Sequence, residues 1–359
     1  MQKFAAFFTA IALSTGVAFA QTGNSESSTQ TGNDNTGEVV QTGQSNTSTF
    51  TSTGDNNDVL VQQNGDANDF TATQTGDNNA ARQRMTAGNS NLVNMNQAGN
   101  GNDGIIEIWG DGNEVDYQQN GDDNRASFNL RGTPPAPGGS VDFNSIDVDQ
   151  TGNGNTATGY VDGDNNSVRA EQVGDDNSFN ARQIGDDNAA VTEQGVFGGA
   201  TGNMVDFNQE GSGNYLETTQ IRADDNVVNA SQIGDDNFFR VGIRGDLNTV
   251  NMNATGDGNR GSWSLSSDFP EEAELNTLDI TQNGDGNITS GFVNGDMNDV
   301  DITQTGNGNR VGSTWFDRDG VQITGNSNTV DVMQSGMGNS SMTTQTGNGN
   351  TATVVQNNN

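Results

Sequence analysis

A short alternation of apolar and polar residues repeats along this chain at intervals of about eleven residues. In the stretch 54–79, the glycines Gly54, Gly65 and Gly76 open three similar turns. Between the turns, the second and fourth residues after each Asn are apolar or small, and the sixth is Gln. The rule is N-x-Φ-x-Φ-x-Q-x-G-x-x-N, where Φ is an apolar or small residue. Residues that alternate in this way share one face of an extended strand, so each unit predicts a short β-strand and a turn.

Glycine and asparagine recur in the turns because a sharp reversal needs backbone conformations that few residues adopt. Glycine takes a positive φ without a steric penalty, and Asn is the next most tolerant residue. The predicted turn residues are Gly54, Asn57, Gly65, Asn68, Gly76, Asn79, Gly174, Asn177, Gly185, Asn188, Gly234, Asn237, Gly306, Asn309, Gly347 and Asn350.

A strand this short cannot bury its apolar face alone, so the units must stack on copies of themselves. One unit with one bend forms half a coil, and two units complete a coil of about 22 residues. Parallel stacking then places Ile108 beside Leu130, and Gln150 beside Gln172. The sequence predicts an all-β, two-sided parallel β-solenoid of about fifteen coils, roughly 70 Å long at ~4.8 Å per strand.

The recurrent Gln predicts a column of amides inside the solenoid. Stacked amides hydrogen-bond to the amides above and below them. Some units carry Ile108, Leu130, Val161 or Ile243 at the same position, which favours an inward side chain. The predicted ladder consists of Gln63, Gln74, Gln97, Gln119, Gln150, Gln172, Gln183, Gln209, Gln232, Gln282, Gln304, Gln334 and Gln345.

The repeat extends over residues 21–359 as one unit with four interruptions. We predict turn insertions near 133–143, 195–202 and 266–276, and an irregular stretch near 315–321 whose inward residues cannot be assigned. The first insertion holds three of the four prolines, which cannot join a sheet ladder. Insertions are expected at turns rather than inside strands. The step to Gly88 is one residue longer than its neighbours, which predicts a β-bulge near Met85.

The first twenty residues differ from the rest and are typical of a secretory signal peptide. Lys3 precedes the apolar run 4–17, and Ala18 and Ala20 place small residues at the cleavage positions. The run is short for a membrane span. We expect cleavage before Gln21 and export of residues 21–359, with no disulfides because the chain has no Cys.

Composition and charge exclude several classes of partner. The net charge of −34 argues against nucleic acid and anionic membranes as partners, because both require basic patches, and no membrane insertion is expected. Only 29% of the residues are hydrophobic, which by itself would indicate disorder. The fixed spacing of these residues indicates a folded repeat instead.

No catalytic, cofactor-binding or metal-binding residues are predicted. The chain has no His or Cys and its one lysine is Lys3, which removes the usual nucleophile–base pairs and most metal ligands. Carboxylate pairs such as Asp122–Asp123 recur at turns and are typical of solvated bends. A β-helix enzyme that degrades polysaccharides would need a cleft with a base. A calcium-binding β-roll would need a nine-residue glycine-rich repeat, which is missing.

The repeat resembles the curlin repeat of curli subunits. The pattern Gln-x-Gly-x-x-Asn-x-Ala/Val stands at Gln74–Ala81, Gln304–Val311 and Gln345–Ala352. The resemblance implies a secreted structural subunit, not an enzyme, that polymerises with itself into extracellular cell-surface amyloid fibres for adhesion and biofilm matrix. It also implies a nucleating subunit and an outer-membrane secretion pore as partners. The alternative is a monomeric cell-surface adhesin or a calcium-binding repeat protein on the same solenoid.

Overall fold

The computed structural model describes residues 23–132, 141–195, 199–220, 223–266, 273–313 and 319–358. Every regular element in these ranges is a β-strand. The predicted signal peptide, residues 1–20, lies outside the described residues. Most of the predicted turn insertions do so as well, because residues 133–140, 196–198 and 267–272 are not described.

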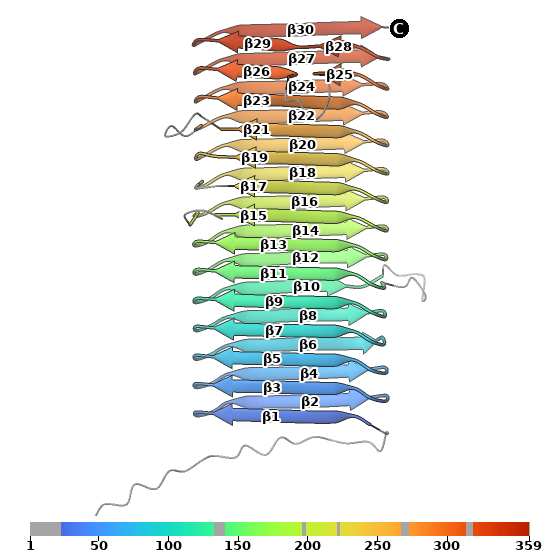
Figure 1. The fold of residues 1–359 in the computed structure, drawn as a ribbon, viewed down its shortest axis with the longest axis vertical. Coiled ribbons are helices and arrows are strands. Elements are labelled where there is room, and N and C mark those ends of the chain that lie inside the picture. Colours follow the sequence, from blue (N-terminus) through green and yellow to red (C-terminus); the bar gives the residue numbers. More distant parts are fainter. Residues whose placement is uncertain are drawn as a thin grey trace, which may run out of the picture.

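The strands form two parallel sheets that lie face to face along one rod (Figure 1). The first sheet contains β1 (Ser25–Thr31), β3 (Thr47–Thr53), β5 (Asp69–Thr75), β7 (Leu92–Ala98), β9 (Glu114–Asn120), β11 (Ser145–Thr151), β13 (Ser167–Val173), β15 (Ala189–Gln194), β17 (Tyr215–Gln220), β19 (Phe238–Ile243), β21 (Arg260–Leu265), β23 (Ile288–Asn294), β25 (Arg310–Val311), β26 (Val321–Thr324), β28 (Ser340–Ser341) and β29 (Thr343–Thr346). The second contains β2 (Thr36–Thr42), β4 (Asp58–Asn64), β6 (Ala80–Ala87), β8 (Asp103–Trp109), β10 (Arg125–Leu130), β12 (Thr156–Asp162), β14 (Ser178–Ile184), β16 (Met204–Glu210), β18 (Val227–Ile233), β20 (Thr249–Thr255), β22 (Thr277–Asn283), β24 (Asp299–Thr305), β27 (Thr329–Gly336) and β30 (Thr351–Asn358).

Up to β25, consecutive strands alternate between the two sheets, so each coil contributes one strand to each; in the last coils, β25 with β26 and β28 with β29 each take the place of one strand of the first sheet. Leu130 pairs with Ile108, and Gln150 pairs with Gln172, as the repeat rule predicts. The structure thus confirms the two-sided parallel β-solenoid, with fourteen strands in the second sheet where about fifteen coils are expected. The register shifts between Met85 and Ala87, which confirms the predicted β-bulge.

One interruption lies inside a strand rather than at a turn. β25 and β26 both pair with β23, through Val311 with Thr289 and Val321 with Gly291. Val311 and Val321 are both buried, so the two pieces together supply the inward residues of a single strand. The expectation that insertions occur only at turns is therefore wrong here. The sheet tolerates this interruption because Val321 re-enters in register with the next inward position.

The interior is a thin layer in which large side chains lie beside small ones. Phe128 and Trp263 are buried. A Cβ atom on Gly159 would lie 2.3 Å from Cε1 of Phe128, and one on Gly291 would lie 2.2 Å from Cζ3 of Trp263. Each bulky ring thus occupies the space left by a glycine in the next strand of its sheet. This size compensation keeps two sheets at a constant separation although the inward residues differ from coil to coil.

The turns stack as closely as the strands do. Gly54 has a φ of +120°, and a Cβ atom there would lie 2.1 Å from the carbonyl oxygen of Gly76 in the next coil. Glycine is needed at this point for both its conformation and its lack of a side chain. After three of the interruptions, Val141, Ala200 or Ala273 takes the place of this glycine and places its carbonyl oxygen against the preceding coil's glycine.

We predict that Gly159→Ala destabilises the solenoid by roughly 1–3 kcal/mol, because the added methyl overpacks the interior against Phe128. Thermal unfolding followed by circular dichroism measures the effect. Gly242→Ala is the matched control, since a Cβ atom at Gly242 meets nothing within 4 Å. Equal melting temperatures for the two variants would contradict the size compensation.

Candidate functional site: stacked amides and the exposed surface

A ladder of glutamine amides runs inside the first sheet from β3 to β15. Each Nε2 donates to Oε1 of the Gln one coil later, as from Gln119 to Gln150 at 3.0 Å and from Gln150 to Gln172 at 2.9 Å. Ser52 begins the ladder by donating to Gln74, and Gln194 receives its last such bond. Because every bond has the same direction, the ladder is polar along the rod.

The second sheet contains three shorter ladders of the same kind. Their bonds join Gln41 to Gln63; Gln183 to Gln209 and Gln232; and Gln282 to Gln304, Gln334 and Gln356. All thirteen glutamines named from the sequence are buried, Gln345 among them at the end of the first sheet. Gln41, Gln194 and Gln356 are further members that the same repeat rule could have identified.

The ladder glutamines also donate to backbone carbonyls, and Gln63 keeps this bond although the next coil offers it no amide. Nε2 of Gln63, whose column continues as Met85, donates to the carbonyl oxygen of Thr47 at 3.0 Å. Ile108, Leu130 and Val161 fill the same column in the following coils and are fully buried. A glutamine position therefore accepts an apolar side chain, even where a neighbouring amide is left unpaired, as Oε1 of Gln183 is beside Val161 and both polar atoms of Gln220 are beside Ile243.

The turn asparagines form two further ladders, which the sequence rule did not resolve. Asn79 is buried, and its backbone N–H and its Nδ2 donate to Oδ1 of Asn57 at 3.0 and 3.1 Å. Its Nδ2 also donates to the carbonyl oxygen of Gly99 in the next coil at 2.9 Å. The same bonds continue on both edges, up to Asn350 on one edge and Asn339 on the other. The signal for these ladders in the sequence was the recurrence of Asn three residues after the turn glycine.

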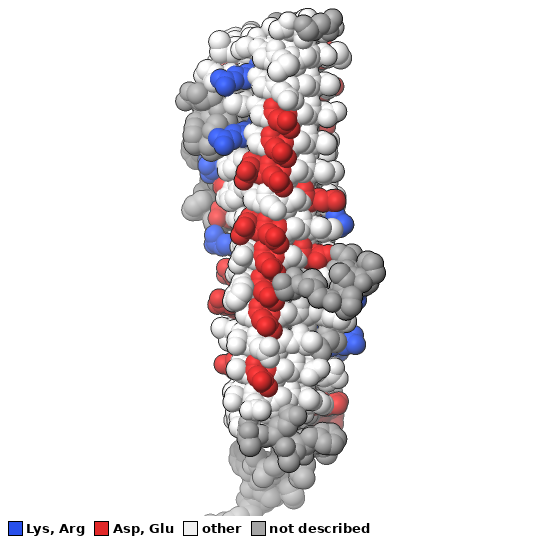
Figure 2. Space-filling view, turned by 90° about the vertical axis from the view of Figure 1, so that its right-hand side faces the viewer, with Lys and Arg blue, Asp and Glu red and all other residues white. Residues whose placement is uncertain are grey.

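Carboxylates stack in a column on the edge where the strands of the second sheet end. The backbone N–H of Asp111 donates to Oδ1 of Asp142, that of Asp142 to Asp164, and that of Asp164 to Asp186, at 2.7–2.9 Å. Figure 2 looks onto this edge and shows the acidic side chains following the rod in two runs. Like charges at strand spacing repel, and the backbone N–H groups offset part of that repulsion.

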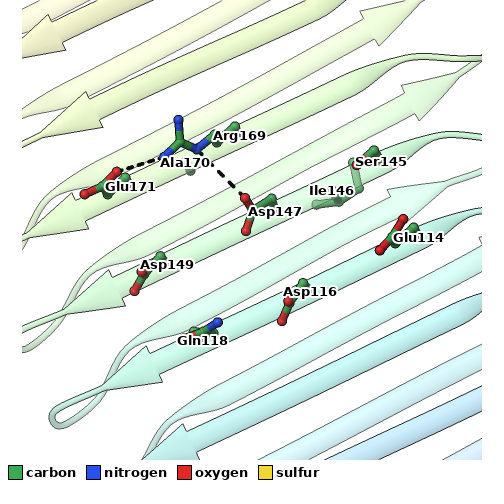
Figure 3. A pocket seen from close by; sticks show the side chains of 10 residues that line it. All are labelled: Glu114, Asp116, Gln118, Ser145, Ile146, Asp147, Asp149, Arg169, Ala170 and Glu171. Carbon is green, nitrogen blue, oxygen red and sulfur yellow. Dashed lines mark hydrogen bonds and ion pairs between the residues drawn. The ribbon is translucent and has the colours of Figure 1, made fainter.

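A shallow acidic hollow of about 360 Å³ lies on the outer face of the first sheet (Figure 3). Its lining residues are Glu114, Asp116, Gln118, Ser145, Ile146, Asp147, Asp149, Arg169, Ala170 and Glu171. Arg169 pairs with Glu171 at 3.1 Å and with Asp147 at 3.8 Å. The hollow is open to solvent along the flat sheet.

Burial raises the pKa of two carboxyls in this hollow. For Asp116 the repulsion from Asp147, Glu114 and Asp149 adds to the effect of burial. For Asp149 the repulsion from Asp147 adds to it, and Arg169 opposes it. Within the described residues no group of three or more His, Cys, Asp or Glu side chains is arranged to hold a metal ion. Nor does any described segment form a helix long and apolar enough to cross a membrane.

We predict that Gln150→Leu destabilises the fold by about 1–3 kcal/mol, because it leaves Oε1 of Gln172 buried without a partner and removes one of the two bonds that Nε2 of Gln119 donates. The melting temperature measures this loss. The control is Gln118→Leu, the same change on an exposed outward side chain of β9, which should shift stability by no more than about 0.5 kcal/mol. A neutral Gln150→Leu variant would show that the inner amides carry no stability.

We also predict that Asp116→Asn raises the melting temperature at pH 7, by on the order of 1 °C because the group is partly screened by solvent. A raised pKa in the folded state means that the stability associated with this group is present at low pH and is lost as the pH rises through that pKa. The gain should therefore disappear near pH 4. Asp69→Asn, at an exposed position flanked in its sheet by the uncharged Thr47 and Leu92, is the matched control in melting curves recorded across pH, and an equal gain for both variants at pH 7 would contradict the effect of the acidic hollow.

A comparison with protein families identifies the same repeating unit. The family model described as Curlin associated repeat matches residues 32–65, 144–174, 276–306 and 325–357. No curated protein matches the chain. The four matches are spread over the solenoid from its first coils to its last, and each contains the turn glycine and asparagine and the inward glutamine. The match of four repeats spread along the chain supports its assignment to the curlin-repeat family.

Proposed function

We propose that this protein is a secreted structural subunit that stacks end to end with copies of itself into curli-like amyloid fibres. It serves cell-surface adhesion and biofilm matrix, and it is not an enzyme. A nucleating subunit and an outer-membrane secretion pore are further partners that the curlin family suggests.

The observation that carries the proposal is that the two ends of the rod present the same columns. In the second sheet, β2 carries Val39 and Gln41 inward, and β30 carries Val354 and Gln356 at the same positions. Continuing the register by one coil sets Val39 of one copy on Val354 of another. It also sets Gln41 of one copy on Gln356 of the other.

The hydrogen-bonding polarity of the two ends is also complementary. The amide of Gln356 accepts from Gln334 and is in position to donate onward, and Gln41 begins its ladder as a donor. Among the described strands, β1 pairs only with β3, and β30 pairs only with β27. Each therefore offers strand-edge N–H and C=O groups, which are a template for pairing with another chain.

The surface does not favour the enzymatic alternative. The acidic hollow is open along a flat sheet, and its one cation, Arg169, is already paired with Glu171 and Asp147. Acid–base chemistry on a polysaccharide requires two carboxyls that flank a bound sugar ring, in a site that holds that ring. A flat, solvated face supplies no such enclosure.

Purified residues 21–359 should form fibres with reflections near ~4.7 and ~10 Å, the strand spacing along the fibre and the sheet separation across it. Val354→Asp should slow elongation by about tenfold or more, because stacking would bury an unpaired carboxylate at a cost of several kcal/mol. Elongation is measured by dye fluorescence and electron microscopy on preformed seeds.

Val355→Asp is the matched control, because Val355 is the next residue and points outward, with 67% of its surface exposed. It should elongate like the unaltered protein. A protein that remains monomeric at high concentration supports the adhesin alternative, and equal slowing by both substitutions argues against stacking through the end of the rod.

A further inference from the structure

The inward positions of the described strands hold a single charged side chain, Glu26 in β1. Its position pairs with Ser48, and the column continues through Phe70 and Val93. The buried polar residues of the described chain are all Asn, Gln, Ser or Thr. Every other described coil has only uncharged side chains at its inward positions, so Glu26 departs from the pattern of the whole solenoid.

Glu26 is exposed because β1 is the first described strand of the rod. Next to it, the hydroxyl of Ser48 is buried and has no hydrogen-bond partner. Nε2 of Gln30 is also buried without a partner. Ser28 pairs with Phe50 at the second inward position of β1. The interior at this end is therefore lined by hydroxyls and amides that are incompletely bonded in the single subunit.

The opposite end of the rod supplies neutral groups to this column. Continuing the register of the first sheet places Ser341 over Glu26, Thr343 over Ser28 and Gln345 over Gln30. β28, β29 and β30 contain no charged side chain. A second copy stacked here would bury Glu26 and would offer no cation to pair with it.

The charged groups on the elements around Glu26 are also acidic. β3 carries none. Asp34 lies in the turn after β1, and Glu38 lies at an exposed outward position of β2. These groups disfavour a second negative charge nearby and supply no counter-ion. An ionised carboxylate in such a place is strongly disfavoured, whereas the neutral carboxyl can both donate and accept a hydrogen bond.

We propose that Glu26 makes end-to-end stacking dependent on protonation: the N-terminal end of one copy accepts the C-terminal end of another only when this carboxyl is neutral. The proposal rests on the proposed function, because it concerns the same contact between copies. In the stack, the carboxyl lies between the hydroxyls of Ser48 and Ser341, the adjacent members of its column. At neutral pH the ionised glutamate holds subunits apart, and acidification allows them to stack.

The test compares seeded elongation of the unaltered protein, Glu26→Gln and Glu38→Gln at pH 5, 6 and 7. If only the protonated end accepts a subunit, the rate for the unaltered protein should fall about tenfold per pH unit, as the protonated fraction of a carboxyl does above its titration range. Glu26→Gln should elongate at pH 7 as fast as at pH 5. Glu38→Gln removes the same charge from an outward position of the same coil and should retain the slope.

Glu26→Ser, which repeats the residue of the next coil at Ser48, provides a second neutral variant. Circular dichroism spectra and melting temperatures show that each subunit is folded. A slope that persists in both Glu26 variants, or that disappears in Glu38→Gln, overturns the role of Glu26 and leaves fibre formation intact. Absence of fibres from every variant at every pH contradicts the proposed function itself.

Discussion

The buried asparagine at each turn is the constraint on which the rest of the solenoid depends. Its Oδ1 receives the backbone N–H and the Nδ2 of the Asn in the next coil, as Asn79 receives those of Asn102. Its Nδ2 meanwhile reaches a turn carbonyl in the next coil, as in the bond from Asn79 to Gly99. A side chain that is short, neutral and able to donate and accept at once is needed at this position. Both turns of every described coil contain it.

The strand interior tolerates far more variation than the turns. The third inward column of the first sheet changes from glutamine to Ile243, Leu265, Val293 and Ile323, and then returns to Gln345. Apolar burial and amide pairing are alternative ways to fill one column, because an apolar side chain brings no polar group of its own, although the amide of Gln220 beside Ile243 is then left without a partner. Glycines opposite large rings, such as Gly159 beside Phe128, keep the layer thickness constant.

Apart from Glu26, the charged side chains of the described strands lie at outward positions, where the repeat places like charges next to one another. A carboxylate at one turn position recurs one coil later, so acidic side chains form columns rather than scattered points. On the first sheet, burial and then the repulsion from Asp147, Glu114 and Asp149 raise the pKa of Asp116. On the second sheet, Asp279, Asp301 and Asp331 form another acidic row, in which burial and the two neighbours raise the pKa of Asp301. A parallel in-register stack therefore gathers carboxyls at several places on the outside of the rod, whereas Glu26 stands at an inward position.

The sequence by itself determined the fold class, the coil length, the inward glutamines and the turn residues. The turns recur every eleven residues, and apolar residues alternate with polar ones between them. Stacked coils are the one arrangement that buries so few apolar side chains with this spacing. Even the bulge near Met85 could be read from one extra residue in a turn-to-turn step. These features are local, and each coil repeats them.

What the tertiary structure alone decided depends on contacts between coils. Whether Asn pairs with its own turn or with the next coil is set by the distance between stacked turns, which no single unit contains. The interruption between Val311 and Val321 could be placed inside a strand only when both halves paired with β23. Likewise, the alternation of the sequence places Glu26 at an inward position. The structure shows that it is exposed, because no described strand lies beyond β1. The sequence of one unit determines where a residue lies within its coil, whereas only the stacked structure determines which residues lie next to it in the adjacent coils.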